Sequence, residues 1–185
     1  MHVEIRWHGR GGQGAWTASN LIAMAAALEG LYVQSFPAFG AERSGAPMLA
    51  FTRISDQPIE YHSMIYEPDV VVVLDHTLLY PDVKQGLKKG GAVVTNYLGN
   101  KDMVLKRLGV ERGEYKIIAI PASKLALEIL RANITNTAMI GGLLKLGDII
   151  KWESVEKAVR LRFKGSIAEK NIELIRKAYE EAVEV

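Results

Sequence analysis

A glycine-rich segment near the N-terminus has the residue types best suited to hold an anion. Residues 7–14 read W-H-G-R-G-G-Q-G, between an apolar-alternating run and a run with helical periodicity. Glycine reaches positive φ and lets a ligand approach the backbone closely. The first N–H groups of a helix have no partner within it, and the helix dipole adds partial positive charge there. The order strand, glycine turn, helix therefore predicts an anion site, most often one for phosphate.

The glycine spacing alone leaves the ligand open. Residues 9–14 match G-x-G-x-x-G, but a dinucleotide site also needs an acidic residue about 20 positions later, at the end of the next strand. The chain has Gln34, Ser35 and Phe36 there, and no Gly-Lys-Ser/Thr follows the glycines to make a P-loop. Three interpretations remain: a phosphate-bearing ligand of another kind, a partner chain docked over the loop, or glycines that only let the helix pack on the strand.

A second polar segment, residues 39–47 (FGAERSGAP), follows the second expected strand. In a parallel sheet it would lie at the same carboxyl edge as the glycine segment, where ligands bind. Arg43 could then hold the same anion through two hydrogen bonds. The alternative is an exposed loop with a solvated Glu42–Arg43 pair.

A third polar segment, residues 133–139, contains Asn136 and Thr137 at an expected helix start. These residues either cap that helix or turn polar groups toward the same edge of the sheet. The four histidines are scattered and no pair has metal-ligand spacing; His8 ends the first strand beside the glycine segment. We therefore expect no metal site and no catalytic set complete within this chain.

Composition narrows the class of protein. The chain has 185 residues, 49% apolar and 24% charged, with a net charge of +2 and no cysteine. Interspersed charges give no case for nucleic acid, and no apolar run approaches the ~18 residues of a membrane span. With no secretory signal in view, a cytoplasmic location is expected. Lack of cysteine excludes disulfides and cysteine-bound iron–sulfur clusters within the chain.

Hydrophobic periodicity predicts one domain, residues 1–185, of α/β class. We expect it to be three-layered and Rossmann-like, with a mostly parallel sheet and a helical C-terminal part. The first strand, helix and second strand are expected to form a βαβ unit with adjacent parallel strands. Ser166 and Glu169 predict a capping box. The expected strands are 2–8, 31–36, 48–54, 59–64 (a hairpin partner), 70–74, 92–95 and 116–120; the expected helices are 13–29, 77–88, 122–132, 135–145, 153–163 and 166–183.

The two loops together resemble a known family. R-G-G-Q-G at 10–14 after a strand, and G-A-E-R-S-G-A-P at 40–47 before another, are similar to gamma subunits of 2-oxoacid:ferredoxin oxidoreductases, above all those of the pyruvate and 2-ketoisovalerate enzymes. V-V-V-V-L-D at 70–75 and N-T-A-M-I-G at 136–141 agree as well. The resemblance spans about residues 1–182.

The resemblance implies a function exercised in a complex. Such enzymes convert a 2-oxoacid and coenzyme A to acyl-CoA and CO2 and reduce ferredoxin. Thiamine diphosphate lies in the alpha and beta chains, and iron–sulfur clusters in the delta chain and often in beta. The gamma chain would cover the active site and help to bind coenzyme A as a substrate, with no tightly bound cofactor of its own. Alternatives are a stand-alone NAD- or flavin-nucleotide-binding oxidoreductase and a purely structural scaffold. The residues that the resemblance places toward the ligand are Gly11, Gly12, Gln13, Gly14, Arg43, Ser44, Asn136 and Thr137.

Overall fold

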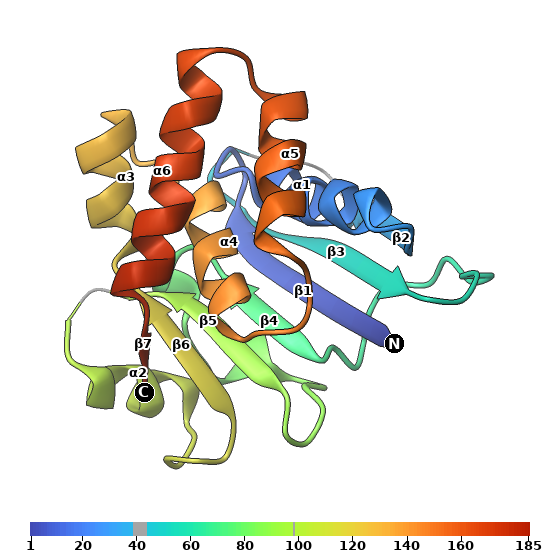
Figure 1. Ribbon diagram of the computed structural model, residues 1–185. Coiled ribbons are helices and arrows are strands. Elements are labelled where there is room, and N and C mark those ends of the chain that lie inside the picture. The colour runs from blue at the N-terminus through green and yellow to red at the C-terminus, as the bar shows by residue number, and fades with distance from the viewer. Residues whose placement is uncertain (39–43, 98) are drawn as a thin grey trace.

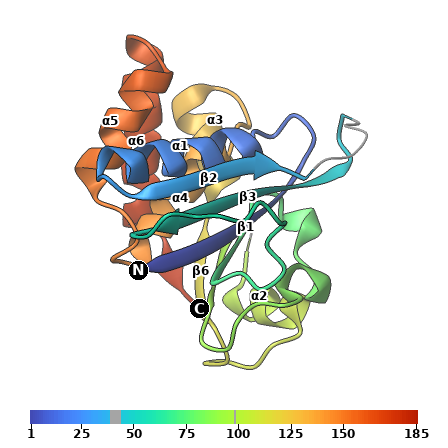
Figure 2. The ribbon, with the colours of Figure 1, turned by 90° about the vertical axis from the view of Figure 1, so that its right-hand side faces the viewer.

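The computed structural model describes residues 1–38, 44–97 and 99–185. Within these residues, seven strands form one sheet in the order β2-β3-β1-β4-β5-β6-β7. Helices α1, α3, α4, α5 and α6 lie on one face of the sheet, and α2 lies on the other (Figures 1 and 2). The three-layer α/β architecture expected from the sequence is confirmed.

The elements follow the chain from the N-terminal strand to a short C-terminal one. The strands are β1 (His2–Arg10), β2 (Tyr32–Pro37), β3 (Pro47–Ser55), β4 (Val70–Val73), β5 (Ala92–Asn96), β6 (Lys116–Ile120) and β7 (Val183–Glu184). The helices are α1 (Ala15–Leu28), η1 (His76–Leu78), η2 (Pro81–Lys84), α2 (Lys101–Leu108), α3 (Ala122–Leu130), α4 (Asn136–Lys145), α5 (Trp152–Arg162) and α6 (Ser166–Glu181), of which η1 and η2 are short 3-10 helices.

The centre of the sheet is parallel. Strands β1, β4, β5 and β6 pair in parallel, and β4 is a run of four valines buried on both faces. β3 pairs antiparallel with β1 on one side and with β2 on the other, and β7 pairs antiparallel with β6. The expectation that β1 and β2 are hydrogen-bonded neighbours is therefore wrong. They run in the same direction, but β3 lies between them because all nine of its residues pair with β1.

Two apolar clusters fix the layers. One joins α1, α4, α5 and α6 to side chains such as Ile5, Val72 and Val94. The other joins η1, η2 and α2 to the opposite face through Val71, Val73 and their neighbours. Alternating side chains of the same buried strands serve both clusters, which explains why these strands are continuously apolar.

Residues 59–64 form no strand, contrary to the expected hairpin. The buried guanidinium of Arg53 donates to the carbonyl of Ser63 (2.7 Å), and Gln34 Nε2 donates to the carbonyl of Tyr61 (2.8 Å). Side chains projecting from the sheet, rather than a backbone ladder, therefore bind this segment.

The expected helix 77–88 is also wrong, and only η1 and η2 form there. Arg6 Nη2 donates to the carbonyls of Val83 and Gln85 at 2.9 and 2.6 Å, so Arg6 binds carbonyl groups that a continuous helix would use internally. Pro81 starts η2 and lacks the N–H that a helix interior requires.

Other differences concern the ends of elements. The sequence patterns did not predict α2 or β7. Helix α6 begins after Gly165 without a side-chain cap, so the expected capping box of Ser166 and Glu169 does not form. The apolar spacing of that helix predicts a buried stripe of Ile172, Ile175, Tyr179 and Ala182, but Tyr179 is 40% exposed.

Candidate functional site

The glycine loop, residues 10–14, touches the segment before β3. Gly11 donates its N–H to the carbonyl of Ala46 (2.8 Å) and accepts from the N–H of Gly45 (3.1 Å). Arg10 Nη1 donates to the carbonyl of Gly45 (3.1 Å). The two segments singled out in the sequence thus meet at one edge of the sheet. Of the second segment, Arg43 lies outside the described residues and Ser44 is exposed.

The glycine loop leaves main-chain groups accessible. Gly12 and Gly14 have φ of 89° and 78°, a region that favours glycine. Helix α1 starts directly after Gly14, and no side chain caps it. Gly12 is exposed, whereas Gly11, Gln13 and Gly14 are partly buried. The loop can therefore present N–H groups, with the positive end of the α1 dipole, to an anion.

Asn136 and Thr137 have different surroundings. The amide of Asn136 lies directly against Gly14, in the space that a Cβ would occupy, and its Oδ1 accepts from the N–H of Thr137 (2.8 Å). Thr137 is fully buried and its hydroxyl donates to Asn171 Oδ1 on α6 (2.8 Å). Asn136 thus borders the glycine loop, whereas Thr137 faces the helical layer.

Beside the glycine loop is a polar crevice of about 150 Å³. It lies between the carboxyl ends of β4 and β5 and the starts of α3 and α4. The chain leaves β1 over one face of the sheet and β4 over the other, so the crevice adjoins a topological switch point, the usual ligand position in an open α/β sheet. The crevice is lined by Gln13, Leu74, Asp75, His76, Thr77, Asn96, Ser123, Asn133 and Thr135.

A hydrogen-bonded network joins the crevice to the loop. Asp75 Oδ2 accepts from Gln13 Nε2 (2.6 Å) and lies 3.3 Å from Arg10 Nε. Asp75 Oδ1 accepts from the N–H and hydroxyl of Thr77 (2.8 and 2.6 Å). Gln13 Oε1 accepts from the N–H of Arg10 (2.7 Å). The sequence alone assigned Asp75 and Thr77 to no site. The signal that could have found Asp75 is an acidic residue at the end of a buried strand, whereas Thr77 had no such signal.

Two titratable groups near the loop have shifted pKa values. Burial raises the pKa of Asp75, but hydrogen bonds from Thr77 and Gln13 and the charge of Arg10 outweigh it, and the net pKa is lowered. Asp75 is therefore ionised at neutral pH. Burial first, and then the charge of Arg6, lower the pKa of His8 to about 3, so this histidine is neutral. His8 Nε2 accepts from Arg6 Nε (3.0 Å).

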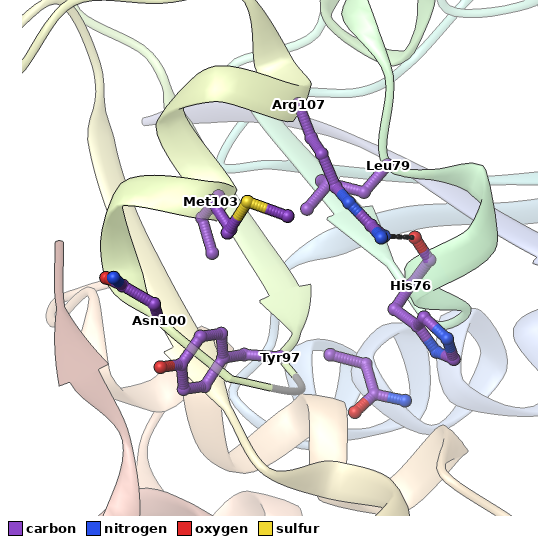
Figure 3. A pocket seen from close by; sticks show the side chains of 8 residues that line it. His76, Leu79, Tyr97, Asn100, Met103 and Arg107 are labelled. Atoms are coloured by element: carbon purple, nitrogen blue, oxygen red, sulfur yellow. Dashed lines mark hydrogen bonds between the residues drawn. The ribbon is translucent and has the colours of Figure 1, made fainter.

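A second, smaller recess of about 50 Å³ adjoins the crevice through His76 and Asn96 (Figure 3). Arg107 donates from Nη1 to the carbonyl of His76 (3.1 Å) and so joins α2 to η1. The recess is too small for a nucleotide. Its lining is His76, Leu79, Asn96, Tyr97, Asn100, Met103, Val104 and Arg107.

The described residues, 1–38, 44–97 and 99–185, offer neither a metal site nor a membrane-spanning helix. They contain no group of three or more His, Asp or Glu side chains placed to hold a metal ion. In the same ranges, no helix has the length and apolar character needed to cross a membrane.

Comparison with known proteins gives a consistent assignment. The family model for pyruvate ferredoxin/flavodoxin oxidoreductase matches residues 4–181. The common gamma subunit of the pyruvate/ketoisovalerate oxidoreductases of Thermococcus litoralis is 52% identical over 98% of this chain and 97% of its own length. Pyruvate synthase subunit PorC of Methanocaldococcus jannaschii is 48% identical, over 97% and 96%.

A solved structure extends the agreement to the fold. The crystal structure of pyruvate oxidoreductase subunit PORC from Thermotoga maritima matches with a TM-score of 0.87 and 39% identity, covering 98% of this chain and 97% of that one. The chain therefore belongs to the pyruvate ferredoxin/flavodoxin oxidoreductase family, as a gamma-type subunit.

Proposed function

We propose that this chain works in a 2-oxoacid:ferredoxin oxidoreductase complex and binds the phosphates of coenzyme A on its glycine loop. Partner alpha, beta and delta subunits would carry thiamine diphosphate and the iron–sulfur clusters. The complex would release CO2 from the 2-oxoacid, form the thioester with coenzyme A and pass the electrons to ferredoxin. In this division of roles the gamma chain binds coenzyme A and covers the active site, and it supplies no catalytic residue.

The observation that carries the proposal is the glycine loop at the start of α1, which is hydrogen-bonded to the segment before β3. Gly11 is fixed to Gly45 and Ala46 by main-chain hydrogen bonds, and α1 has no side-chain cap. A pyrophosphate group suits such a site because it accepts several N–H bonds and carries negative charge near the helix dipole. Arg43, next to Ser44 in sequence, would add a charge-assisted contact.

The size of the crevice supports a site shared with a partner chain. Pockets for drug-sized ligands have volumes of about 300–1,000 Å³, whereas the crevice beside the loop has about 150 Å³. The chain alone can hold a part of coenzyme A, such as its phosphates. The remainder would lie against other subunits, which is consistent with a covering role.

The stand-alone dinucleotide enzyme is the weaker alternative. In the structure, Gln34 donates to the carbonyl of Tyr61 and Ser35 bonds to Ser19, and neither is acidic. Strand β2, moreover, is separated from β1 by β3, so its end does not adjoin the glycine loop as the second strand of a dinucleotide fold does.

The test is reconstitution with the partner subunits and substitution of Arg43. We expect Arg43→Ala to raise the KM of the complex for coenzyme A by about 10- to 150-fold, the equivalent of a charged hydrogen bond worth ~1.5–3 kcal/mol. Arg112→Ala is the matched control, because Arg112 is exposed and pairs with Asp102 of α2, which lies on the face of the sheet opposite to α1. An unchanged KM in Arg43→Ala would favour the scaffold interpretation. Turnover by the purified chain without partners would contradict the subunit assignment.

A further inference from the structure

The carboxylate of Asp75 occupies a central position at the crevice. It follows β4 after one residue, Leu74, and is the acidic member of the set of residues that line the crevice. Asp75 Oδ2 lies 2.6 Å from Nε2 of Gln13 in the glycine loop, and a carboxylate so close to the loop would repel an anionic ligand if its charge were unpaired. Its contacts therefore decide whether it opposes or supports binding.

Both carboxylate oxygens of Asp75 are fully engaged by neighbouring donors. Oδ1 accepts two hydrogen bonds from Thr77, through the main-chain N–H and the hydroxyl. Oδ2 accepts from Gln13 Nε2 and forms an ion pair with Arg10. Because Arg10 pairs with it, the carboxylate repels a phosphate on the loop less strongly, and it makes no contact with the phosphate itself.

Through these partners Asp75 holds both ends of the glycine loop. Gln13 bridges Asp75 and the main-chain N–H of Arg10, which closes the loop on itself. Arg10 in turn binds the carbonyl of Gly45 and the hydroxyl of Thr77. One carboxylate thus connects the end of β1, the start of α1, the turn after β4 and the segment before β3.

A glycine loop needs such a support. Gly12 has no heavy atom within 4 Å of the space for its missing Cβ, and glycine loses more backbone entropy on ordering than any other residue. A loop that was free to move would lose affinity for its ligand through that entropy, whereas a preorganised loop would not.

We propose that Asp75 is a positioning residue for the glycine loop, acting through Gln13 and Arg10 without touching the coenzyme A bound there. This inference rests on the proposed binding of coenzyme A by that loop. Its consequence is that removing the carboxylate impairs coenzyme A binding while the 2-oxoacid site and the redox chemistry, held by other subunits, are unaffected.

The experiment uses Asp75→Asn in the reconstituted complex. The substitution keeps the shape of the side chain but removes its charge and one acceptor. We expect the KM for coenzyme A to rise about tenfold, with kcat at saturating coenzyme A and the KM for the 2-oxoacid unchanged. Hydrogen exchange of a peptide covering residues 9–17 should be faster than in the wild-type complex.

Asp69→Asn is the matched control. Asp69 lies just before β4, at its opposite end, and also accepts two hydrogen bonds, from the N–H of Glu4 and from Lys88 (2.8 Å each). Its loss should leave the KM for coenzyme A and the exchange of residues 9–17 unchanged. A purely structural contribution of β4-flanking carboxylates would affect both variants alike, and that result would overturn the inference.

A second variant keeps the test valid if Asp75→Asn does not assemble. Gln13→Ala removes the bridge but leaves Asp75 paired with Arg10 and Thr77, and it should raise the same KM by a smaller factor. If both variants assemble, their double variant should show less than the product of the two effects, because both act on one bridge. If the two increases in the KM for coenzyme A multiply in the double variant, Asp75 does not act through Gln13 and the inference is contradicted.

The outcomes separate this inference from the function it rests on. If Arg43→Ala raises the KM for coenzyme A and Asp75→Asn does not, the loop binds coenzyme A and the role of Asp75 is wrong. If neither substitution changes that KM, the proposed function fails as well.

Discussion

At the scale of single residues, the side chains of the site are engaged with one another, while the main chain is left accessible. In the described ranges, every buried side-chain nitrogen and oxygen has a hydrogen-bond partner. Gln13, Asp75 and Asn136 are all used to hold the loop or a neighbouring helix. Arg10, Gly11 and Gln13 already donate their main-chain N–H groups within the protein. The N–H groups that the loop can still offer to a ligand are therefore those of Gly12, Gly14 and the first turn of α1.

Gly14 offers a first prediction at this scale. A Cβ at position 14 would collide with the amide of Asn136, and φ of 78° is unfavourable for alanine. We expect Gly14→Ala to lower the free energy of unfolding by about 2–4 kcal/mol, from backbone strain and overpacking together. Urea unfolding followed by circular dichroism measures the change.

Gly30→Ala is the control for the backbone contribution. Gly30 has φ of 80° at the end of α1, and the space for its Cβ is empty. We expect a loss of about 1 kcal/mol there. Adding Asn136→Ala to Gly14→Ala should reduce the loss toward that of Gly30→Ala. Equal losses in the two single variants would show that contact with Asn136 is unimportant.

His8 gives a pH-dependent prediction. Its folded pKa of about 3 lies below the ~6.5 of an unfolded histidine, so the unfolded chain binds more protons between these values. The contribution of neutral His8 to the free energy of unfolding is fully present above about pH 6.5. It falls by up to about 1.4 kcal/mol for each pH unit as the pH drops toward 3. His8→Gln keeps an acceptor for Arg6 and cannot titrate.

The measurement is the free energy of unfolding of both proteins between about pH 7 and pH 4. The wild-type chain should lose stability more steeply than His8→Gln as the pH falls. Other groups, including Asp75, titrate in both proteins and cancel in the difference. Parallel curves would mean that His8 becomes protonated without penalty in the folded state.

At the scale of elements, α4 packs closely on two neighbours at once. Its Gly142 faces the sheet, where a Cβ would lie 2.7 Å from Val94. Its Gly141 faces α6, where a Cβ would lie 2.8 Å from Ala178 Cβ and from the backbone N of Tyr179. Two adjacent glycines thus let one helix pack closely on a sheet and on a second helix at once.

These glycines lead to a prediction about helix packing. Gly141→Ala would press on the backbone of α6, which cannot yield without moving the helix, and we expect a loss of about 2–4 kcal/mol of stability. Gly142→Ala would press on the side chains of Ile120 and Val94 rather than on backbone, and it should cost less because side chains can shift without moving a whole element. Thermal and urea unfolding of the two variants provide the comparison. A larger loss in Gly142→Ala would contradict this reading of the interface.

The elements that the sequence predicted well are those with strong local patterns. The continuous valine run of β4 is typical of a strand buried on both faces, and the apolar residues of α1 and most of those of α6 have helical spacing. Two errors, at 59–64 and 77–88, come from long-range contacts. Gln34 lies 27 residues before Tyr61 and Arg6 lies 77 residues before Val83, and their hydrogen bonds to main-chain carbonyls decide the local conformation. No local pattern contains that information.

The candidate site divides in the same way. The meeting of the glycine loop with residues 45–46 was foreseeable, because a carboxyl edge gathers such loops. The reason for the meeting was wrong, since β1 and β2 are not adjacent and the segment reaches the loop by leading into β3 beside β1. The opposite orientations of Asn136 and Thr137 could not be predicted, because they depend on the positions of Gly14 and α6.

At the scale of the whole molecule, the layers leave the carboxyl edge of the central strands uncovered. Helices cover one face of the sheet, and η1, η2 and α2 cover part of the other (Figure 1). Trp16, in the first turn of α1, and Ile134, just before α4, are each nearly half exposed at 47% and 46%. A polar crevice beside exposed apolar side chains suits a surface that another subunit completes.

This arrangement predicts that affinity for coenzyme A depends on the complex. The isolated chain supplies a crevice of about 150 Å³ and the main chain of one loop, which suffice for a phosphate group but not for a whole coenzyme. We expect calorimetry to give a Kd for the purified chain at least about 100-fold weaker than for the reconstituted complex, because contacts worth roughly 3 kcal/mol are absent. Trp16→Ala should weaken assembly and so bring the Kd of the complex closer to that of the isolated chain. Leu161→Ala, at an exposed position in the last turn of α5, should leave the Kd of the complex unchanged. Equal affinity of chain and complex would show that this chain contains the entire coenzyme A site and that its partners cover nothing.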